Sequence, residues 1–281
     1  MKIKYYILLL LLEFFVGTAF LQRQLDNPLE QQRREQQRKE QQKEAQRLKA
    51  QREIFAKLNI QMIFVEGGTF TMGCTSGQSS DYFDNEKPAH RVTVSGFYIG
   101  KYEVTQAQWK AIMGNNPSYF KGDNLPVVCI SWDDVQKFIR KLNAQTGKQY
   151  RLPTEAEWEF AACGGNRSQG YKYSGSNTVG NVAWYEENSG GTTHAVGSKS
   201  SNELGIYDMS GNVWEWCSDW YGNYSSNVQI NPQGPSTGSI RVNRGGSWNY
   251  GARLMRASYR GSDAPGNLNY ALGFRLACDP Q

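Results

Sequence analysis

The chain has 281 residues, a formal net charge of +5 and five cysteines, and 39% of its residues are hydrophobic. This length can bury a core without disulfides, and the apolar fraction excludes a disordered chain. Of the 31 basic and 26 acidic residues, 12 and 7 precede residue 60, which leaves 19 of each for residues 60–281. A neutral main body offers no bulk charge for a phosphate backbone, so we expect no nucleic-acid partner.

Residues 1–21 combine a basic start with an apolar run. Lys2 and Lys4 precede the run, and Glu13 interrupts it. The pattern is typical of a secretory signal, and both apolar stretches together are long enough to span a bilayer. The segment is therefore a cleaved signal peptide or an uncleaved signal anchor. Either alternative predicts an exported protein of the cell envelope, periplasmic or anchored in the membrane.

Residues 22–59 form a polar segment of different composition. Ten glutamines fall between Gln22 and Gln51 among mixed charges, and Ala45 is the only apolar residue from Gln31 to Arg47. Gln, Glu, Lys and Arg favour a helix, but without an apolar stripe they encode no coiled-coil seam. The segment is either a solvated helical linker or a partly disordered one. As a helix, thirty residues would reach roughly 45 Å and could act as a stalk.

Residues 60–281 contain all eight tryptophans, all five cysteines and 28 of the 29 glycines. So many glycines indicate many turns, and the segment reads as one loop-rich folded domain. Strand-like patterns occur at residues 62–65, 91–94 and 97–99, so we expect an α+β fold. Three helix starts are predicted from capping boxes, namely Thr105 with Gln108, Ser131 with Asp134 and Thr154 with Glu157, with stops at Gly114 and Gly164.

Common enzyme motifs are missing from the sequence. The two histidines, His90 and His194, are far apart and lack zinc-ligand spacing. There is no Walker loop, no Gly-x-Ser-x-Gly string and no Cys-x-x-Cys pair. The sequence therefore indicates neither a histidine zinc site, nor a phosphate-binding loop, nor a hydrolase nucleophile.

Five strings occur in a distinctive order. They are FYIGKYEVT from Phe97, RLPTEAEWE from Arg151, NELGIYDMSGNVWEW from Asn202, RGGSW from Arg244 and GFRL from Gly273. In this order they resemble the formylglycine-generating enzyme, or sulfatase-modifying factor, domain family over roughly residues 61–279. The resemblance implies a C-type-lectin-like fold of the α+β class, bound calcium and a substrate groove.

The same resemblance implies an oxidase that holds Cu(I) between two cysteines and converts a sulfatase cysteine to formylglycine. In this sequence the matching positions hold Tyr250 and Met255, and no cysteine lies between Cys217 and Cys278. Soft thiolates select Cu(I), whereas a phenol is a harder ligand and a lone thioether is weak. We therefore expect no copper site, no catalytic residue and a pseudoenzyme.

The resemblance also implies two calcium sites made of oxygen ligands, which suit this ion. The first would use the carboxylates of Asp208 and Glu215 and the carbonyls of Gly211 and Val213. Its alternative is that the two acids only cap turns. The second site, in which Asn replaces the Asp that is frequent in the family, is expected to be weaker and comprises Asn181, Val182, Asn188 and Gly190.

The segment beside the degenerate copper positions is rich in the residue types that dominate binding hot spots. A structural role is expected for Arg244 and Trp248, which lie within the family string RGGSW. The favoured hypothesis is a non-catalytic domain that binds a protein, peptide or glycan. The alternatives are a formylglycine-generating oxidoreductase and a structural component of an envelope assembly. The predicted groove comprises Trp248, Asn249, Tyr250, Arg253, Met255, Arg256, Ser258 and Tyr259.

Overall fold

The computed structural model describes residues 16, 18, 27–75 and 82–280. The chain divides into two compact units, residues 1–54 and 55–281. The predicted signal peptide or anchor at residues 1–21 lies outside the described residues, apart from Val16 and Thr18. Within the described part of the chain, no helix is long and apolar enough to cross a membrane. The leader and the envelope location stay predictions.

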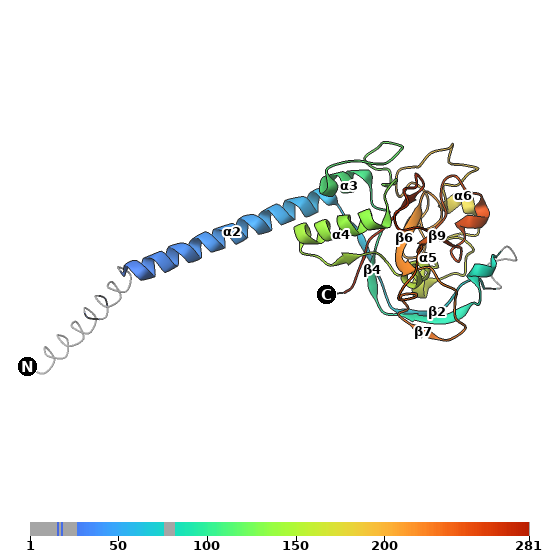
Figure 1. Ribbon diagram of the computed structural model, residues 1–281, viewed down its shortest axis with the longest axis horizontal. Coiled ribbons are helices and arrows are strands. Elements are labelled where there is room, and N and C mark those ends of the chain that lie inside the picture. The colour runs from blue at the N-terminus through green and yellow to red at the C-terminus, as the bar shows by residue number, and fades with distance from the viewer. Residues whose placement is uncertain (1–15, 17, 19–26, 76–81, 281) are drawn as a thin grey trace, which may run out of the picture. The chain divides into compact units, whose positions relative to one another are not determined.

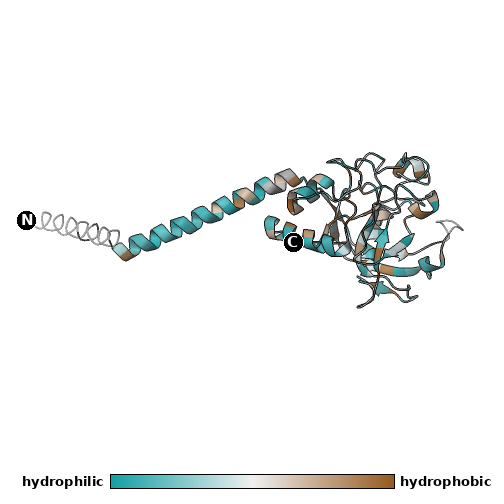
Figure 2. Ribbon diagram, turned by 45° about the horizontal axis from the view of Figure 1, so that its top comes forward, coloured by the Kyte–Doolittle hydropathy of each residue, from teal (hydrophilic) through white to brown (hydrophobic). Residues whose placement is uncertain are grey.

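The polar segment forms one long helix, α2, over Pro28–Leu58 (Figure 1). Asn27 caps its start, because the Asn27 side-chain oxygen accepts a hydrogen bond of 3.0 Å from the Leu29 amide. Its surface is hydrophilic along most of its length (Figure 2). Ion pairs between neighbouring turns, such as Lys39 with Glu35 at 2.7 Å, support it. The helical prediction for this segment is confirmed, and its role as a stalk stays a prediction.

The three predicted helix starts are confirmed. α3 spans Gln106–Met113, α4 spans Trp132–Thr146 and α5 spans Glu155–Ala162. At each N-cap the hydroxyl oxygen accepts a hydrogen bond from the amide three residues on, and the acid or amide side chain at that third position bonds back. Gly114 ends α3 with a φ of +84°, which a side chain would disfavour. These helices form where predicted because the capping signal is local.

Three small sheets and the short helix α6, Val179–Val182, lie among long loops in the described part of the folded unit (Figure 1). Their strand orders are β1-β4-β11-β5, β10-β6-β8-β9 and β2-β3-β7. The predicted strands are confirmed as β1, β3 and β4. The full set is β1 Met62–Val65, β2 Gly68–Met72, β3 His90–Val94, β4 Phe97–Gly100, β5 Tyr150–Arg151, β6 Trp214–Trp220, β7 Gln229–Ile230, β8 Arg241–Arg244, β9 Arg260–Asp263, β10 Leu272–Gly273 and β11 Ala277–Cys278.

Helix α5 lies at the centre of the core. Seven of its eight residues are buried, so the helix is enclosed on nearly all sides. Trp158 and Phe160 pack with Val92 of β3, Val242 of β8 and Cys217 of β6 in the main hydrophobic cluster. The same cluster includes Val65 of β1 and Ile99 of β4, so the core joins all three sheets around one short helix.

Four buried arginines tie the loops to this core. Each forms an ion pair with a buried glutamate, and several also donate to backbone carbonyls. Removing one partner of such a pair typically costs about 3–5 kcal/mol, because the other charge is left buried alone. Arg244 has the structural role that its string suggested. The pairs are Arg244 with Glu159, Arg256 with Glu86, Arg260 with Glu155 and Arg275 with Glu215.

Candidate functional site

The segment that follows β8 contains the residues predicted to line a groove. It leaves the sheet through Gly245 and Gly246, whose φ angles of +97° and +75° are left-handed. A side chain at Gly246 would clash with the thioether of Met255. The two glycines therefore allow the chain to fold closely over the short 3-10 helix η4, Ala252–Met255.

Tyr250 presents its ring to the surface from this segment. Its side chain is 40% exposed, and its ring meets Trp214 edge to face at 5.7 Å. Its backbone is fixed at both ends, because its amide donates to Ser247 and its carbonyl accepts from Glu186. The backbone of Tyr250 is thus held in place while its ring remains accessible.

A hollow of about 320 Å³ lies beside Tyr250. Tyr259 extends its aromatic wall, since it packs on Trp214 at 5.7 Å and on Phe83 at 5.1 Å. Burial, and after it the charge of Glu86, raises the pKa of the Tyr259 phenol. The lining residues are Asn85, Trp214, Asn243, Tyr250, Leu254, Tyr259, Arg260, Gly261, Ser262, Asp263, Asn269 and Leu272. We call this cavity the Tyr250 hollow.

Three residues of the predicted groove lie in the interior. Met255 is fully buried in a second hydrophobic cluster with Tyr173 and Tyr185. Arg256 and Ser258 are also fully buried, and both donate to the carboxylate of Glu86. Their burial contradicts their placement as groove residues: Glu86, distant in sequence, draws Arg256 and Ser258 inward, and hydrophobic packing does so for Met255.

The other predicted residues do reach the surface or its edge. Trp248 packs against Phe120 and Tyr270, and its indole N–H is buried without an acceptor among the described residues. Asn249 donates to the Tyr270 hydroxyl at 3.3 Å. Arg253 is exposed and stacks over the ring of Phe83, with its guanidinium carbon 3.7 Å from the ring centroid. Of the predicted groove residues, Tyr250 and Tyr259 line the Tyr250 hollow, whereas Trp248, Asn249 and Arg253 are not part of its lining.

The residues of the first predicted calcium site are buried together with other charges. Both oxygens of Glu215 accept hydrogen bonds from Arg275, and one also accepts from Trp158. Asp208 accepts from the Gly197 amide at 2.6 Å. Sequence reasoning missed Glu103, although this buried acid lies within the first family string. Burial, followed by the charges of Asp208 and Glu215, raises the pKa of Glu103 well above its usual value.

The excess negative charge of this cluster would suit a bound cation, but its carboxylates alone do not form a set of metal ligands. Three carboxylates face the single guanidinium of Arg275. Within residues 27–75 and 82–280, however, no three His, Cys, Asp or Glu side chains are grouped as metal ligands. A calcium ion here would need the carbonyls of Gly211 and Val213 as well, which is how the site was predicted. The calcium site stays a prediction.

The second predicted calcium site is a tight loop whose polar groups already have partners. The Asn188 side chain accepts from the Tyr185 amide and donates to the Ala183 carbonyl, both at 2.9 Å. The Asn181 carbonyl accepts from Ser200, and Val182 is buried. Gly190 has a φ of +63°. Asn188 therefore closes the loop, and metal binding there stays a prediction.

Among the described residues, Cys129, Cys217 and Cys278 are free thiols. Cys74 and Cys217 are buried, and burial raises the pKa of the Cys217 thiol well above its usual value. Reactive cysteines have lowered pKa values, so Cys217 has the character of a packing residue.

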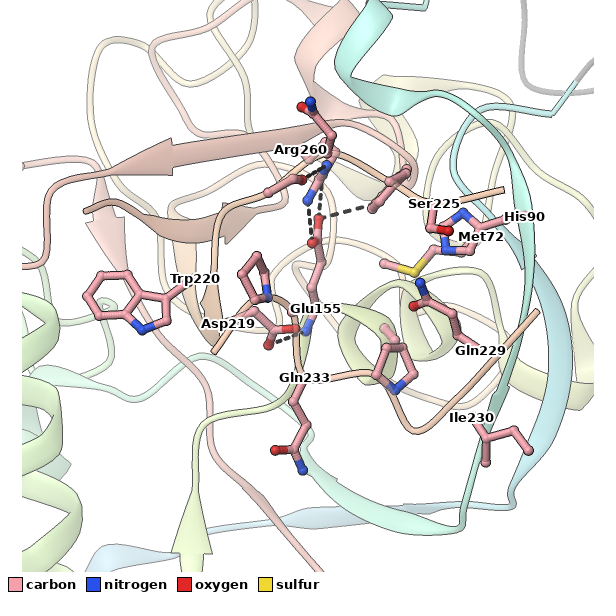
Figure 3. Close-up of a pocket in the computed structure, with 17 residues that line it drawn as sticks. Met72, His90, Glu155, Asp219, Trp220, Ser225, Gln229, Ile230, Gln233 and Arg260 are labelled. Atoms are coloured by element: carbon pink, nitrogen blue, oxygen red, sulfur yellow. Dashed lines mark hydrogen bonds and ion pairs between the residues drawn. The ribbon is translucent and has the colours of Figure 1, made fainter. Parts of the chain in front are cut away.

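A larger cavity, of about 470 Å³, lies where sequence reasoning proposed nothing (Figure 3). His90, Glu155, Asp219 and Arg260 point toward it from four different elements. Glu155 is held by Arg260, and its backbone amide donates to Asp219 at 2.9 Å. No motif could have revealed this cavity, because its residues meet only in the folded chain.

Comparison with known proteins defines the class to which this fold belongs. The family model described as the sulfatase-modifying factor enzyme 1-like domain matches residues 49–280. The chain belongs to this family, as its ordered strings indicated. The fold prediction is confirmed, since the neighbouring solved structures share this architecture.

Individual relatives show how broadly the domain is used. The chain is 36% identical to "Chaperone protein LppX" of Paenibacillus barcinonensis, over 76% of this chain and 88% of that protein. It is 30% identical to the formylglycine-generating enzyme of Thermomonospora curvata, over 78% and 93%. Among solved structures, Treponema denticola variable protein 1 superposes with a TM-score of 0.71 at 34% identity, over 78% of this chain and 95% of that one. This chain spans only 38% of the chlamydial serine/threonine-protein kinases that it also matches.

Proposed function

We propose that this chain is a non-catalytic member of its family that binds a protein, peptide or glycan partner at the Tyr250 hollow. One observation supports this most directly. The two positions where the oxidase would need thiolates hold the accessible phenol of Tyr250 and the buried thioether of Met255. Without that pair, Cu(I) has no soft anionic ligands to hold it for oxygen activation.

The composition of the hollow supports a binding role. Tyr250, Trp214 and Tyr259 supply large apolar faces, and Asn243 and Asn269 add amide groups at its lining. Tyr and Trp are the residue types that concentrate binding energy at interfaces. About 320 Å³ is at the low end for a ligand pocket, so the hollow suits one side chain or one sugar ring of a larger partner.

In our proposal, the protein meets this partner in the cell envelope. The support is the apolar leader at residues 1–21, together with the polar helix α2, which would act as a spacer. One relative is named as a chaperone protein, and contact with another polypeptide would suit the same role here. Calcium at the Asp208 site would stabilise the loops that frame the fold.

The first experiment tests the absence of catalysis. The full chain is incubated with Cu(I), oxygen and a Cys-x-Pro-x-Arg peptide, and the peptide is analysed by mass spectrometry. We expect the thiol to remain intact. Conversion of the cysteine to an aldehyde would refute the proposal. A formylglycine-generating enzyme run in parallel shows that the assay works.

The second experiment tests the hollow as a binding site. The full chain is screened against peptide and glycan arrays, and the hits are titrated with the wild type and with Tyr250→Ala. We expect Tyr250→Ala to weaken binding by tenfold or more, as hot-spot truncations do. Phe64→Ala is the matched control, because Phe64 is a half-exposed aromatic residue on β1 outside the hollow. Equal loss with both variants would count against the hollow.

A further inference from the structure

Arg241, at the start of β8, is clamped between two tryptophans. Its guanidinium carbon lies 3.9 Å from the ring centroid of Trp132 and 3.4 Å from that of Trp220. The Trp132 indole is itself fixed, because its N–H donates to the Cys217 carbonyl at 2.9 Å. Stacking on both faces holds the guanidinium plane in one orientation and leaves only its edge for a partner.

Arg241 also differs from the other enclosed arginines in what it pairs with. The four buried arginines of the core and Arg151 each form an ion pair with a carboxylate. Across the part of the chain that the structure describes, Arg241 has no such partner. Its Nη1 donates to the Ser218 carbonyl at 2.7 Å, and its buried Nε has no acceptor. Burial accordingly lowers the pKa of Arg241.

This guanidinium lines a groove of about 570 Å³. The acids of the groove are already committed, since Glu157 and Asp279 both pair with Arg151, at 2.7 and 2.5 Å. The volume is that of an ordinary small-ligand pocket. Side-chain amides of Gln136 and Gln233 join Arg241 in the lining. Arg241 therefore lines a groove large enough for a small molecule and forms no ion pair there, although the charges of Asp219 and Asp133 lie close enough to act on it.

We propose that this groove binds a small ligand through a carboxylate that pairs with Arg241. The planar guanidinium edge matches a carboxylate, and its fixed orientation reduces the entropy lost on binding. The groove shares no lining residue with the Tyr250 hollow, so this site is independent of the proposed function. Two sources offer the required group at the right size, the carboxyl end of a peptide and a uronic acid.

Tryptophan fluorescence of the full chain tests the site directly, because Trp132 and Trp220 contact the guanidinium. The protein is titrated at constant ionic strength with N-acetylglycine and with glucuronate. N-acetylglycinamide and glucose are the uncharged counterparts. We expect a saturable change with at least one acid and none with its neutral counterpart. The acid that responds identifies the source, and a response to both indicates recognition of the carboxylate alone.

Two variants locate the response. Arg241→Gln should weaken acid binding at least tenfold, and near-UV circular dichroism shows whether its fold is intact. Lys199→Gln is the matched control, since the Lys199 ammonium also lies over a tryptophan ring, that of Trp184, but outside the groove, and it should bind as the wild type does. The proposal is overturned if neither acid gives a saturable change, or if each neutral counterpart acts equally. That comparison needs only the wild type, so it holds even if Arg241→Gln does not fold.

Discussion

Asp219 is a buried carboxyl group whose hydrogen bonds come from a backbone amide and a hydroxyl. Glu155 supplies the amide and Ser218 the hydroxyl, at 2.9 Å each. No guanidinium within the described residues forms an ion pair with it, in contrast to Glu155 beside it, which pairs with Arg260. Burial, and after it the charge of Glu155, raises the pKa of Asp219 to about 7.

This raised pKa makes stability depend on pH in a defined direction. An unfolded aspartate ionises at a pH of about 3.9, so between pH 5 and 7 the folded protein keeps a proton that the unfolded chain has lost. The free energy of unfolding therefore falls as pH rises through this window. Asp219→Asn keeps an acceptor for the Glu155 amide but cannot ionise. The stability of the variant relative to wild type should rise by about 3 kcal/mol from pH 5 to pH 8.

Urea unfolding at pH 5 and pH 8 measures this difference. Asp133→Asn is the matched control, because Asp133 is exposed on the first turn of α4. The control should show the same stability relative to wild type at both pH values. A difference for Asp219→Asn that stays constant with pH would contradict the assignment of the proton to this group.

The sequence predicted the position of a residue correctly where that position depends on residues close to it in the chain. The internal role of Arg244 was anticipated from the RGGSW string that contains it, and Tyr250, two residues beyond that string, was predicted to line a groove. Arg256 and Ser258 were misplaced, because their partner, Glu86, lies 170 and 172 residues away in the chain. Composition shows that an arginine is present, whereas its ion pair depends on how distant segments meet.

Helix α2 differs from the helices of the folded unit in what supports it. α4 buries Val135, Phe138, Ile139 and Leu142 along one face, which is the spacing that predicted it. α2 has no comparable stripe and relies on helix propensity and surface ion pairs. Such pairs are worth only a few tenths of a kcal/mol each. A long helix stabilised in this way melts gradually rather than cooperatively.

We therefore expect two thermal transitions in one protein. On heating, the helical signal at 222 nm should decline gradually at temperatures where the near-UV signal is unchanged. Every tryptophan follows residue 60, so the near-UV signal reports the folded unit. Placing glycine at Gln42 and Ala45 should reduce the 222 nm signal and leave the near-UV midpoint in place. One coincident transition by both signals would show that α2 depends on the folded unit.

Elements were predictable from sequence when their signals were short-range. The capping boxes at Thr105, Ser131 and Thr154 each use residues three apart, and all three helices begin where expected. The two-residue strands β5, β7, β10 and β11 were not predicted. Each exists only because another strand lies beside it, and no local pattern marks two residues as a strand.

At the scale of the whole molecule, the calcium proposal predicts a change in thermal stability. A ligand that binds only the folded state stabilises it by about 2.7 kcal/mol at one hundred times its Kd. For a unit of this size that corresponds to a rise in Tm of about 5–10 °C. We expect Tm to fall by this order when calcium is removed with a chelator and to recover when calcium is restored.

The response should depend on the first predicted site. Asp208→Asn removes a carboxylate and should abolish the calcium-dependent part of the Tm. Asn188→Ala changes the second site and should leave most of the response in place. Differential scanning fluorimetry with calcium, with magnesium and with chelator measures all three proteins. A wild-type Tm that is identical with calcium and with chelator would refute the site.

The order β1-β4-β11-β5 has a consequence for how the molecule is made. β11, at Ala277–Cys278, lies between β4 and β5, which precede it by more than a hundred residues. During synthesis, β4 and β5 are complete long before the strand that separates them exists. Their facing edges stay open until then, and such edges invite wrong pairing. The two earlier strands therefore depend on a segment made more than a hundred residues later to close the gap between them, whereas β1 and β4 can pair as soon as both have been synthesised.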